Sequence, residues 1–173
     1  MRVDLDPSVR PDVVASLTDL EGVADASVDA VFSSHNLEHV YAHEVPEALA
    51  QFRRVLKEGG FALVTTPDLE AVARAIVKNG LDEKLYDSPA GPVAPLDVIY
   101  GHRPSVRTSE FMAHRTGFSK RTLLRAMAQA FPAAACGYGR SWDLWALGLV
   151  KAAPGEAEAM LKEIALQLTP ARA

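Results

Sequence analysis

Two apolar segments flank an amphipathic segment in the first half of this chain, and their order constrains the fold more than any other feature. The first, "SVDAVFSS" (27–34), ends in small polar residues, and the last, "FALVTT" (61–66), has the composition of a buried strand. The segment between them, "EVPEALAQFRRVLKEGG" (44–60), places apolar residues at helical spacing, and we expect Gly59 and Gly60 to end the helix. Strand, helix and strand in this order close with right-handed parallel pairing, so the sequence predicts an α/β layered fold.

Further elements are predicted on both sides of this unit. Before it, "RVDLD" (2–6) and "PDVVASL" (11–17) are short strand candidates. The elements expected after it are a helix over 69–79, a helix that starts at the N-cap Ser119, an antiparallel pair of strands formed by 135–142 and 143–150, and an amphipathic helix over 155–168. Residues 81–118 begin with a stretch rich in proline and glycine, which predicts a long ordered loop or lid.

Length and composition limit the number of domains and the classes of partner. A chain of 173 residues, 49% hydrophobic, has room for one domain, which we place at 1–153, with residues 154–173 as a helix packed on it. The net charge is −4 without a broad cationic segment, so we expect no nucleic acid as a partner, and no apolar run is long enough for a membrane span. Cys136 is the single cysteine and the amino terminus lacks a signal peptide's apolar core, so we expect a cytoplasmic protein.

The stretch "SSHNLEHVYAH" (33–43) spaces three histidines four residues apart: His35, His39 and His43. On a continuous helix this spacing lets three imidazoles share one face and is compatible with zinc. The zincin pattern, however, has glutamate directly after the first histidine, and Asn36 stands there instead. We therefore predict no bound metal.

The runs "VDLDP", "SVDAVFSSHNLEHV" and "EALAQFRRVLKEGGFALVTTPDL" together resemble class I S-adenosylmethionine-dependent methyltransferases of the type 11 group. The resemblance covers residues 2–150. It implies a doubly wound, mostly parallel Rossmann-like sheet in the order 3-2-1-4-5-7-6, with the cofactor across the carboxyl ends of the strands. It also implies a transferase that acts on a small-molecule or glycan-like acceptor.

The resemblance assigns roles to individual residues. Asp4 matches the acidic residue that accepts hydrogen bonds from the ribose hydroxyls of S-adenosylmethionine, while Ser16 and Leu17 occupy the place of the adenine contact. Ser33 and His35 follow the family's fourth strand and are candidate walls of the active cleft, where a neutral imidazole can take a proton from the acceptor. Glu38 and His39 have a structural alternative, since they can begin the next helix and tie its first turn to the sheet.

The segment 81–118 is the expected cover of the cleft and the source of acceptor contacts. It gathers titratable and cationic side chains, namely His102, Arg103, Arg107, His114 and Arg115. Arg103 and Arg115 can bind a carboxylate or phosphate of the acceptor, together with His102 and His114. Solvated surface charge is an equally good interpretation of any single member.

The chain departs from the family at its amino terminus, because no strand and no "GxGxG" loop precede Asp4. A glycine loop lets the backbone approach the cofactor closely, so we expect weak or absent S-adenosylmethionine binding by this chain. Two functions stay open: an enzyme, and a non-catalytic interaction or regulatory domain. The gap in the sheet either closes by direct pairing of the 2–6 and 27–34 strands, giving the order 3-2-4-5-7-6, or is filled by another chain. We expect closure together with homo-oligomerisation through the uncovered surface.

Overall fold

The computed structural model describes residues 1–139, 142–153 and 155–168. Its strands are β1 (Val3–Asp4), β2 (Val13–Val14), β3 (Val28–Ser34), β4 (Leu56–Pro67), β5 (Tyr86–Ser88), β6 (Gly91–Val93), β7 (Ala133–Tyr138) and β8 (Asp143–Leu149). Its α-helices are α1 (Val45–Val55), α2 (Leu69–Asn79), α3 (Pro95–Tyr100), α4 (Arg103–Val106), α5 (Lys120–Ala130) and α6 (Glu156–Leu168). Three short 3-10 helices are η1 (Pro7–Val9), η2 (Leu37–His39) and η3 (Glu110–Met112).

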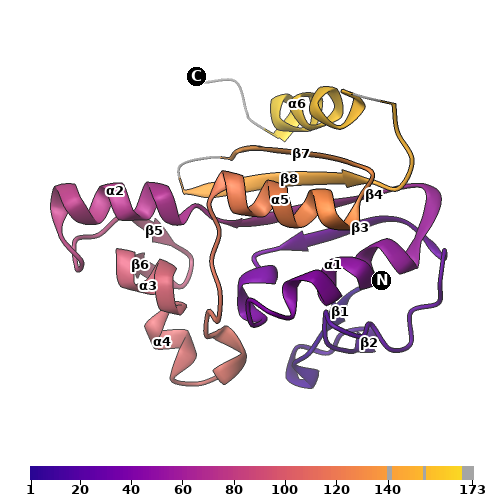
Figure 1. Cartoon of the computed structure of the whole chain (residues 1–173). Coiled ribbons are helices and arrows are strands. Elements are labelled where there is room, and N and C mark those ends of the chain that lie inside the picture. The colour runs from indigo at the N-terminus through magenta and orange to yellow at the C-terminus, as the bar shows by residue number, and fades with distance from the viewer. Residues whose placement is uncertain (140–141, 154, 169–173) are drawn as a thin grey trace.

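The main sheet has four strands in the order β3-β4-β8-β7. Strands β3 and β4 are parallel, as the strand, helix and strand pattern predicts, and β8 is antiparallel to both of its neighbours. Three of the four strands therefore run in the same direction. Helices α1 and α5 lie on one face of this sheet and α6 lies on the other (Figure 1), which confirms the α/β, doubly wound class.

Each face of the sheet buries its own cluster of apolar side chains. On the α1 and α5 side, Phe52 and Met127 meet Val64 of β4 in the largest core cluster, and all three are almost fully buried. On the other side, Leu147 of β8 and Leu161 of α6 pack in a second cluster. Helix α6 packs on the sheet through this contact; residues 154 and 169–173 of the predicted terminal helix lie outside the described residues.

Helix α1 ends four residues earlier than the sequence suggested. The glycine pair Gly59–Gly60 does not terminate it, because the helix stops at Val55 and β4 begins at Leu56. The backbone amides of Ala26 and Ser27 donate to the carbonyl oxygens of Arg54 and Val55, at 2.9 and 2.8 Å. A neighbouring segment thus satisfies two carbonyls of the last turn, which a glycine cap otherwise serves.

The predicted closure of the sheet is wrong. Strands β1 and β2 pair with each other in parallel and form a separate two-stranded sheet, so β1 does not pair with β3 in the described structure. Val3 and Val13 instead pack their side chains against the core cluster beneath α1. Side-chain packing holds the β1–β2 unit at a distance from β3, because two-residue strands form too few main-chain hydrogen bonds to draw the edges together.

The segment 81–118 contains more regular structure than the long loop that the sequence predicted. It forms the β5–β6 hairpin and the helices α3, α4 and η3, and it lies beside α2 at one end of the molecule (Figure 1). The carboxylate of Asp97, 5% exposed, accepts hydrogen bonds from the amides of Ala94 and Arg103 and from the Arg103 guanidinium. This ion pair, between a buried carboxylate and a half-exposed guanidinium, organises a proline-rich sequence that has little helical periodicity.

Within the described ranges, the helices are all too short or too polar to span a bilayer.

Candidate functional site

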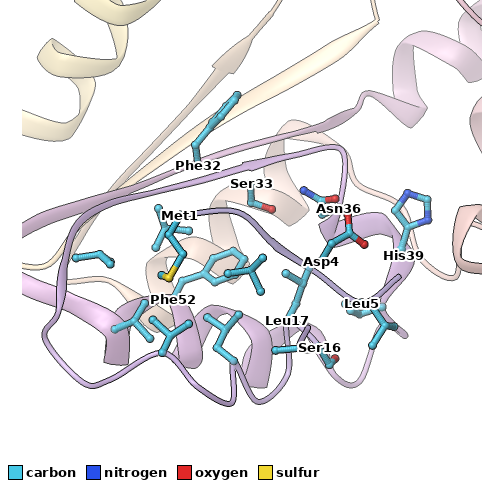
Figure 2. Close-up of a pocket in the computed structure, with 18 of the residues that line it drawn as sticks. Met1, Asp4, Leu5, Ser16, Leu17, Phe32, Ser33, Asn36, His39 and Phe52 are labelled. Atoms are coloured by element: carbon cyan, nitrogen blue, oxygen red, sulfur yellow. The ribbon is translucent and has the colours of Figure 1, made fainter. Parts of the chain in front are cut away.

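A cavity of about 310 Å³ separates β1–β2 from β3, with α1 along one side (Figure 2). Its volume lies at the lower end of the range of small-molecule sites in proteins, roughly 300–1,000 Å³. The lining changes character along β3. Next to the start of the strand the walls are apolar and include Val3, Val28, Val31, Phe52 and Val55; next to its end they are polar and include Asp4, Ser16, Ser33, Asn36, His39 and Arg115.

All four residues that the sequence assigned to the cofactor line this cavity. Asp4, Ser16 and Leu17 come from the β1–β2 side, and Ser33 comes from β3 opposite them (Figure 2). The hydroxyl of Ser33 is buried and has no hydrogen-bond partner among the described residues. The carboxylate of Asp4 is exposed and accepts one hydrogen bond from the Asp6 amide at 2.9 Å, which leaves further lone pairs free.

These residues fit S-adenosylmethionine in part. An acidic side chain, two hydroxyls and a cavity of suitable size are present at the polar end. The chain supplies no glycine-rich loop, and the apolar end of the cavity offers no hydrogen bonds from side chains to a charged ligand. Asp4, Ser16, Leu17 and Ser33 are therefore the residues that would hold the cofactor.

His35 lies beyond the end of β3 and does not line the cavity. Its backbone adopts a φ of 53°, which is uncommon outside glycine, and its amide donates to the Thr65 carbonyl at 3.0 Å. Its Nδ1 is 3.2 Å from Oε1 of Glu38, and its Nε2 is 3.6 Å from Oδ1 of Asp143. Glu38, assisted by Asp143, raises the pKa of His35, while burial opposes that shift. The imidazole is thus held between two carboxylates.

Asp143 is a site residue that the sequence analysis missed. It opens β8, and antiparallel pairing with β4 sets it opposite Pro67, at the carboxyl end of β4. Burial raises the pKa of Asp143, His35 lowers it, and Glu38 raises it further. The predicted antiparallel strand over 143–150 already contained the information that places Asp143. A strand that runs antiparallel to its neighbours begins at the edge of the sheet where those neighbours end.

A second group of side chains surrounds Glu38, whose side chain is 1% exposed. His39 of η2 and His114 of the 81–118 segment meet edge to face, with ring centroids 4.8 Å apart. The carbonyl of Glu38 accepts hydrogen bonds from the amides of Arg115 and Thr116, at 2.8 and 3.1 Å. Two segments that are far apart in sequence are therefore joined at the polar end of the cavity.

The predicted acceptor-binding residues divide into two sets. His114 lies in the Glu38 group, and Arg115 lines the cavity. His102, Arg103 and Arg107 do not line the cavity. The guanidinium of Arg103 binds Asp97, His102 Nδ1 is 2.7 Å from the Ser105 hydroxyl, and Arg107 is exposed. Part of the 81–118 segment reaches the cavity and the remainder forms its own substructure.

Residues 3–64 match the family profile described as "Methyltransferase domain", which confirms the resemblance seen in the sequence. The match spans β1 to most of β4 and includes Asp4, Ser16, Leu17 and Ser33. No curated protein matches the sequence closely enough to count as a relative.

Solved structures share the fold at low sequence identity. A SAM-dependent methyltransferase from Archaeoglobus fulgidus is 12% identical with a TM-score of 0.53, and the alignment covers 85% of this chain and 74% of that one. A Pyrococcus horikoshii OT3 protein is 15% identical with a TM-score of 0.51, covering 86% and 70%. A possible histamine N-methyltransferase from Thermotoga maritima is 20% identical with a TM-score of 0.49, covering 79% of this chain and 62% of its own length. The chain thus spans less than two thirds of that last structure.

Proposed function

We propose that this chain, a domain of the class I methyltransferase type, takes part in S-adenosylmethionine-dependent methylation of a small-molecule or glycan-like acceptor. One observation carries the proposal: Asp4 and Ser33, at the ends of facing strands, line the polar end of a single cavity. Ligands of open α/β sheets generally lie at the carboxyl ends of the strands, which is where these two residues are found.

Each residue of the polar end has a role in this proposal. Asp4 accepts hydrogen bonds from the ribose hydroxyls, Ser16 and Leu17 contact the adenine, and the buried hydroxyl of Ser33 faces the methionine end. The cofactor supplies an electrophilic methyl group when bound. His35 does not line the cavity but lies between the lining residues Ser33 and Asn36, and in this proposal it takes the proton that an oxygen or nitrogen acceptor releases.

The acceptor side is formed by the part of the 81–118 segment that reaches the cavity. Arg115 offers a guanidinium to a carboxylate or phosphate of the acceptor, and it lies 4.9 Å from the ring of Tyr41. The side chains of His102 and Arg103 bind Ser105 and Asp97 within the 81–118 segment. In this proposal they support the segment that carries Arg115 and do not contact the acceptor themselves.

We propose weak cofactor binding by the chain taken alone. Residues 1–173 include no loop of the form GxGxG, and the apolar half of the cavity offers no side-chain hydrogen bonds to a charged ligand. Titration calorimetry with S-adenosylmethionine is expected to give a dissociation constant weaker than about 0.1 mM. A low-micromolar constant would show that cofactor binding is unimpaired.

The matched variants are Asp4→Ala and Asp6→Ala. Asp6 caps η1 by accepting from the Ser8 amide and does not line the cavity. Loss of the remaining affinity in Asp4→Ala, with Asp6→Ala unchanged, supports the proposed ribose contact. Equal affinities in both variants would refute it.

A non-catalytic interaction domain is the second candidate function, and the edge of β3 favours it. Among the described residues, strand β3 pairs only with β4, and Phe32 on this strand is 67% exposed. An unpaired edge with an exposed aromatic side chain is a template for another strand, from a second copy or a different chain. Absence of any cofactor binding at millimolar concentration, together with stable self-association, would favour this function.

A further inference from the structure

We propose that Glu38, His39 and His114 form a binding site for a divalent transition-metal ion of the zinc class. The inference goes beyond methyl transfer, since neither the fold nor the family match assigns a metal to this chain. It rests on the geometry of the three side chains, on their hydrogen bonds, and on the burial of one carboxylate.

The three side chains converge on one point. One ring nitrogen of each histidine and one carboxylate oxygen of Glu38 all lie within 4.8 Å of one another. A tetrahedral site with bonds of 2.0–2.1 Å holds its ligand atoms about 3.4 Å apart. Small rotations of the side chains close this difference, because both imidazoles are only half-buried and have room to turn.

The hydrogen bonds of the two histidines leave one nitrogen of each ring free for a metal. Nδ1 of His39 is 3.0 Å from the Ala113 carbonyl oxygen, and Nδ1 of His114 is 2.8 Å from the Val98 carbonyl oxygen. A carbonyl only accepts, so Nδ1 carries the proton in both rings. In the neutral ring this places the free lone pair on Nε2. Metal-binding histidines are usually oriented in this way, by a hydrogen bond from the other ring nitrogen to a carbonyl or carboxylate.

Glu38 provides the independent observation. Its side chain is 1% exposed, and neither carboxylate oxygen has a hydrogen-bond partner in the described part of the chain. Nδ1 of His35 lies 3.2 Å from Oε1 and forms an ion pair with it when the ring is protonated, so Oε2 is the oxygen that has neither a hydrogen bond nor a charged partner among the described residues. A buried carboxylate oxygen without a donor is costly, and a cation bound to it removes that cost.

The main chain holds the ligands in place. The amides of Arg115 and Thr116 donate to the Glu38 carbonyl, and the Ala113 carbonyl accepts from His39. These bonds join the residues on both sides of His114 to η2, so the third ligand cannot drift from the first two without breaking them. Such support is a requirement of a pre-organised metal site.

Two imidazoles and one carboxylate suit zinc and its neighbours better than magnesium, which prefers oxygen ligands. Three protein ligands also leave a coordination position open for water or an acceptor atom. His39 lines the cavity, so an ion bound here is reachable from the polar end where the acceptor would lie. This set differs from the three evenly spaced histidines in the sequence, because His35 and His43 are not members of it, and the proposal replaces the expectation of no bound metal that the histidine spacing gave.

The experiment uses untagged protein of residues 1–173 that has been treated with chelator and then titrated with zinc chloride. Calorimetry is expected to show one ion per chain with a dissociation constant of about 1 µM or tighter. Cobalt(II) is expected to give the visible absorption of a tetrahedral or five-coordinate site. Magnesium chloride is expected to give no heat of binding.

The ligand variants are Glu38→Gln, His39→Ala and His114→Ala. Each is expected to weaken zinc binding by about 100-fold or more, since loss of even an outer partner costs roughly 10–100-fold. The controls are His43→Ala, an exposed histidine that stacks on Tyr41, and Glu47→Gln, an exposed glutamate of α1; both are expected to bind like the wild type.

Circular dichroism melting decides whether each variant is folded. If Glu38→Gln does not fold, the half-buried His114→Ala carries the test. The proposal is overturned if zinc binds at no defined stoichiometry, if the ligand variants bind as tightly as the wild type, or if His43→Ala loses as much affinity as His114→Ala.

Discussion

The ion pair of buried Asp97 and half-exposed Arg103 gives the sharpest stability prediction. Asp97 is 5% exposed, and Arg103 Nε donates to its Oδ1 at 2.7 Å. Burial by itself would raise the pKa of Asp97, but hydrogen bonds from the Arg103 side chain and from the amides of Ala94 and Arg103 outweigh it. The result is a pKa lowered from 3.8 to about 2. The Asp97→Asn substitution removes the charge and keeps the shape.

The magnitude follows from the linkage between protonation and folding. A pKa of 3.8 in the unfolded chain and of about 2 in the folded chain corresponds to roughly 2 kcal/mol in the free energy of unfolding. Because the Arg103 side chain is half-exposed, solvent screening reduces this contribution to about 1–2 kcal/mol. The folded pKa lies below the unfolded one. The contribution is therefore complete above about pH 4 and is lost as the pH falls towards 2.

In urea unfolding near pH 6, the free energy of unfolding of Asp97→Asn is expected to be about 1–2 kcal/mol lower than that of the wild type. This gap is expected to narrow steadily below about pH 4. Asp87→Asn is the control, since Asp87 is an exposed carboxylate paired only with exposed Lys84, and we expect a change within about 0.5 kcal/mol. A gap that stays constant from neutral pH to pH 2, or no gap at all, would refute the reasoning.

Three further predictions concern the backbone, the core and the sheet edge. Gly101 has a φ of 93° and its added Cβ would collide with the Met112 carbonyl, whereas Gly80 has a φ of 101° and open space. Gly80→Ala is expected to lower the free energy of unfolding by about 1–3 kcal/mol, through backbone strain alone. Gly101→Ala is expected to lower it by more, because the collision adds to the strain, and equal losses in the two variants would contradict the collision. Phe52→Ala, at a residue 1% exposed, is expected to cost about 3–5 kcal/mol in urea unfolding, and a loss below 1 kcal/mol would contradict its burial. Phe32→Glu is expected to lower the mass measured by light scattering if the β3 edge self-associates; an unchanged oligomer would place the interface elsewhere.

Local patterns predicted much of the fold. Apolar spacing identified α1, Ser119 marked the start of α5, and alternating strand runs gave the antiparallel β7–β8 pair. These features depend on residues a few positions apart, so the local sequence predicts them and the structure contains them. The four predicted cofactor residues line one cavity, with Asp4 and Ser33 at or near the ends of β1 and β3 and with Ser16 and Leu17 just after β2.

Tertiary structure alone decided how the two sheets and the distant site residues meet. The separation of β1–β2 from β3 depends on side-chain packing against the α1 face, and no local signal reports that balance. Arg103, which carries the same charge as Arg115, is bound by Asp97, whereas Arg115 reaches the cavity. His114 joins Glu38 across 76 positions of sequence because the amides of the residues after it bind the Glu38 carbonyl. Contacts of this kind are set by the path of the whole chain, and the composition of either segment cannot specify them.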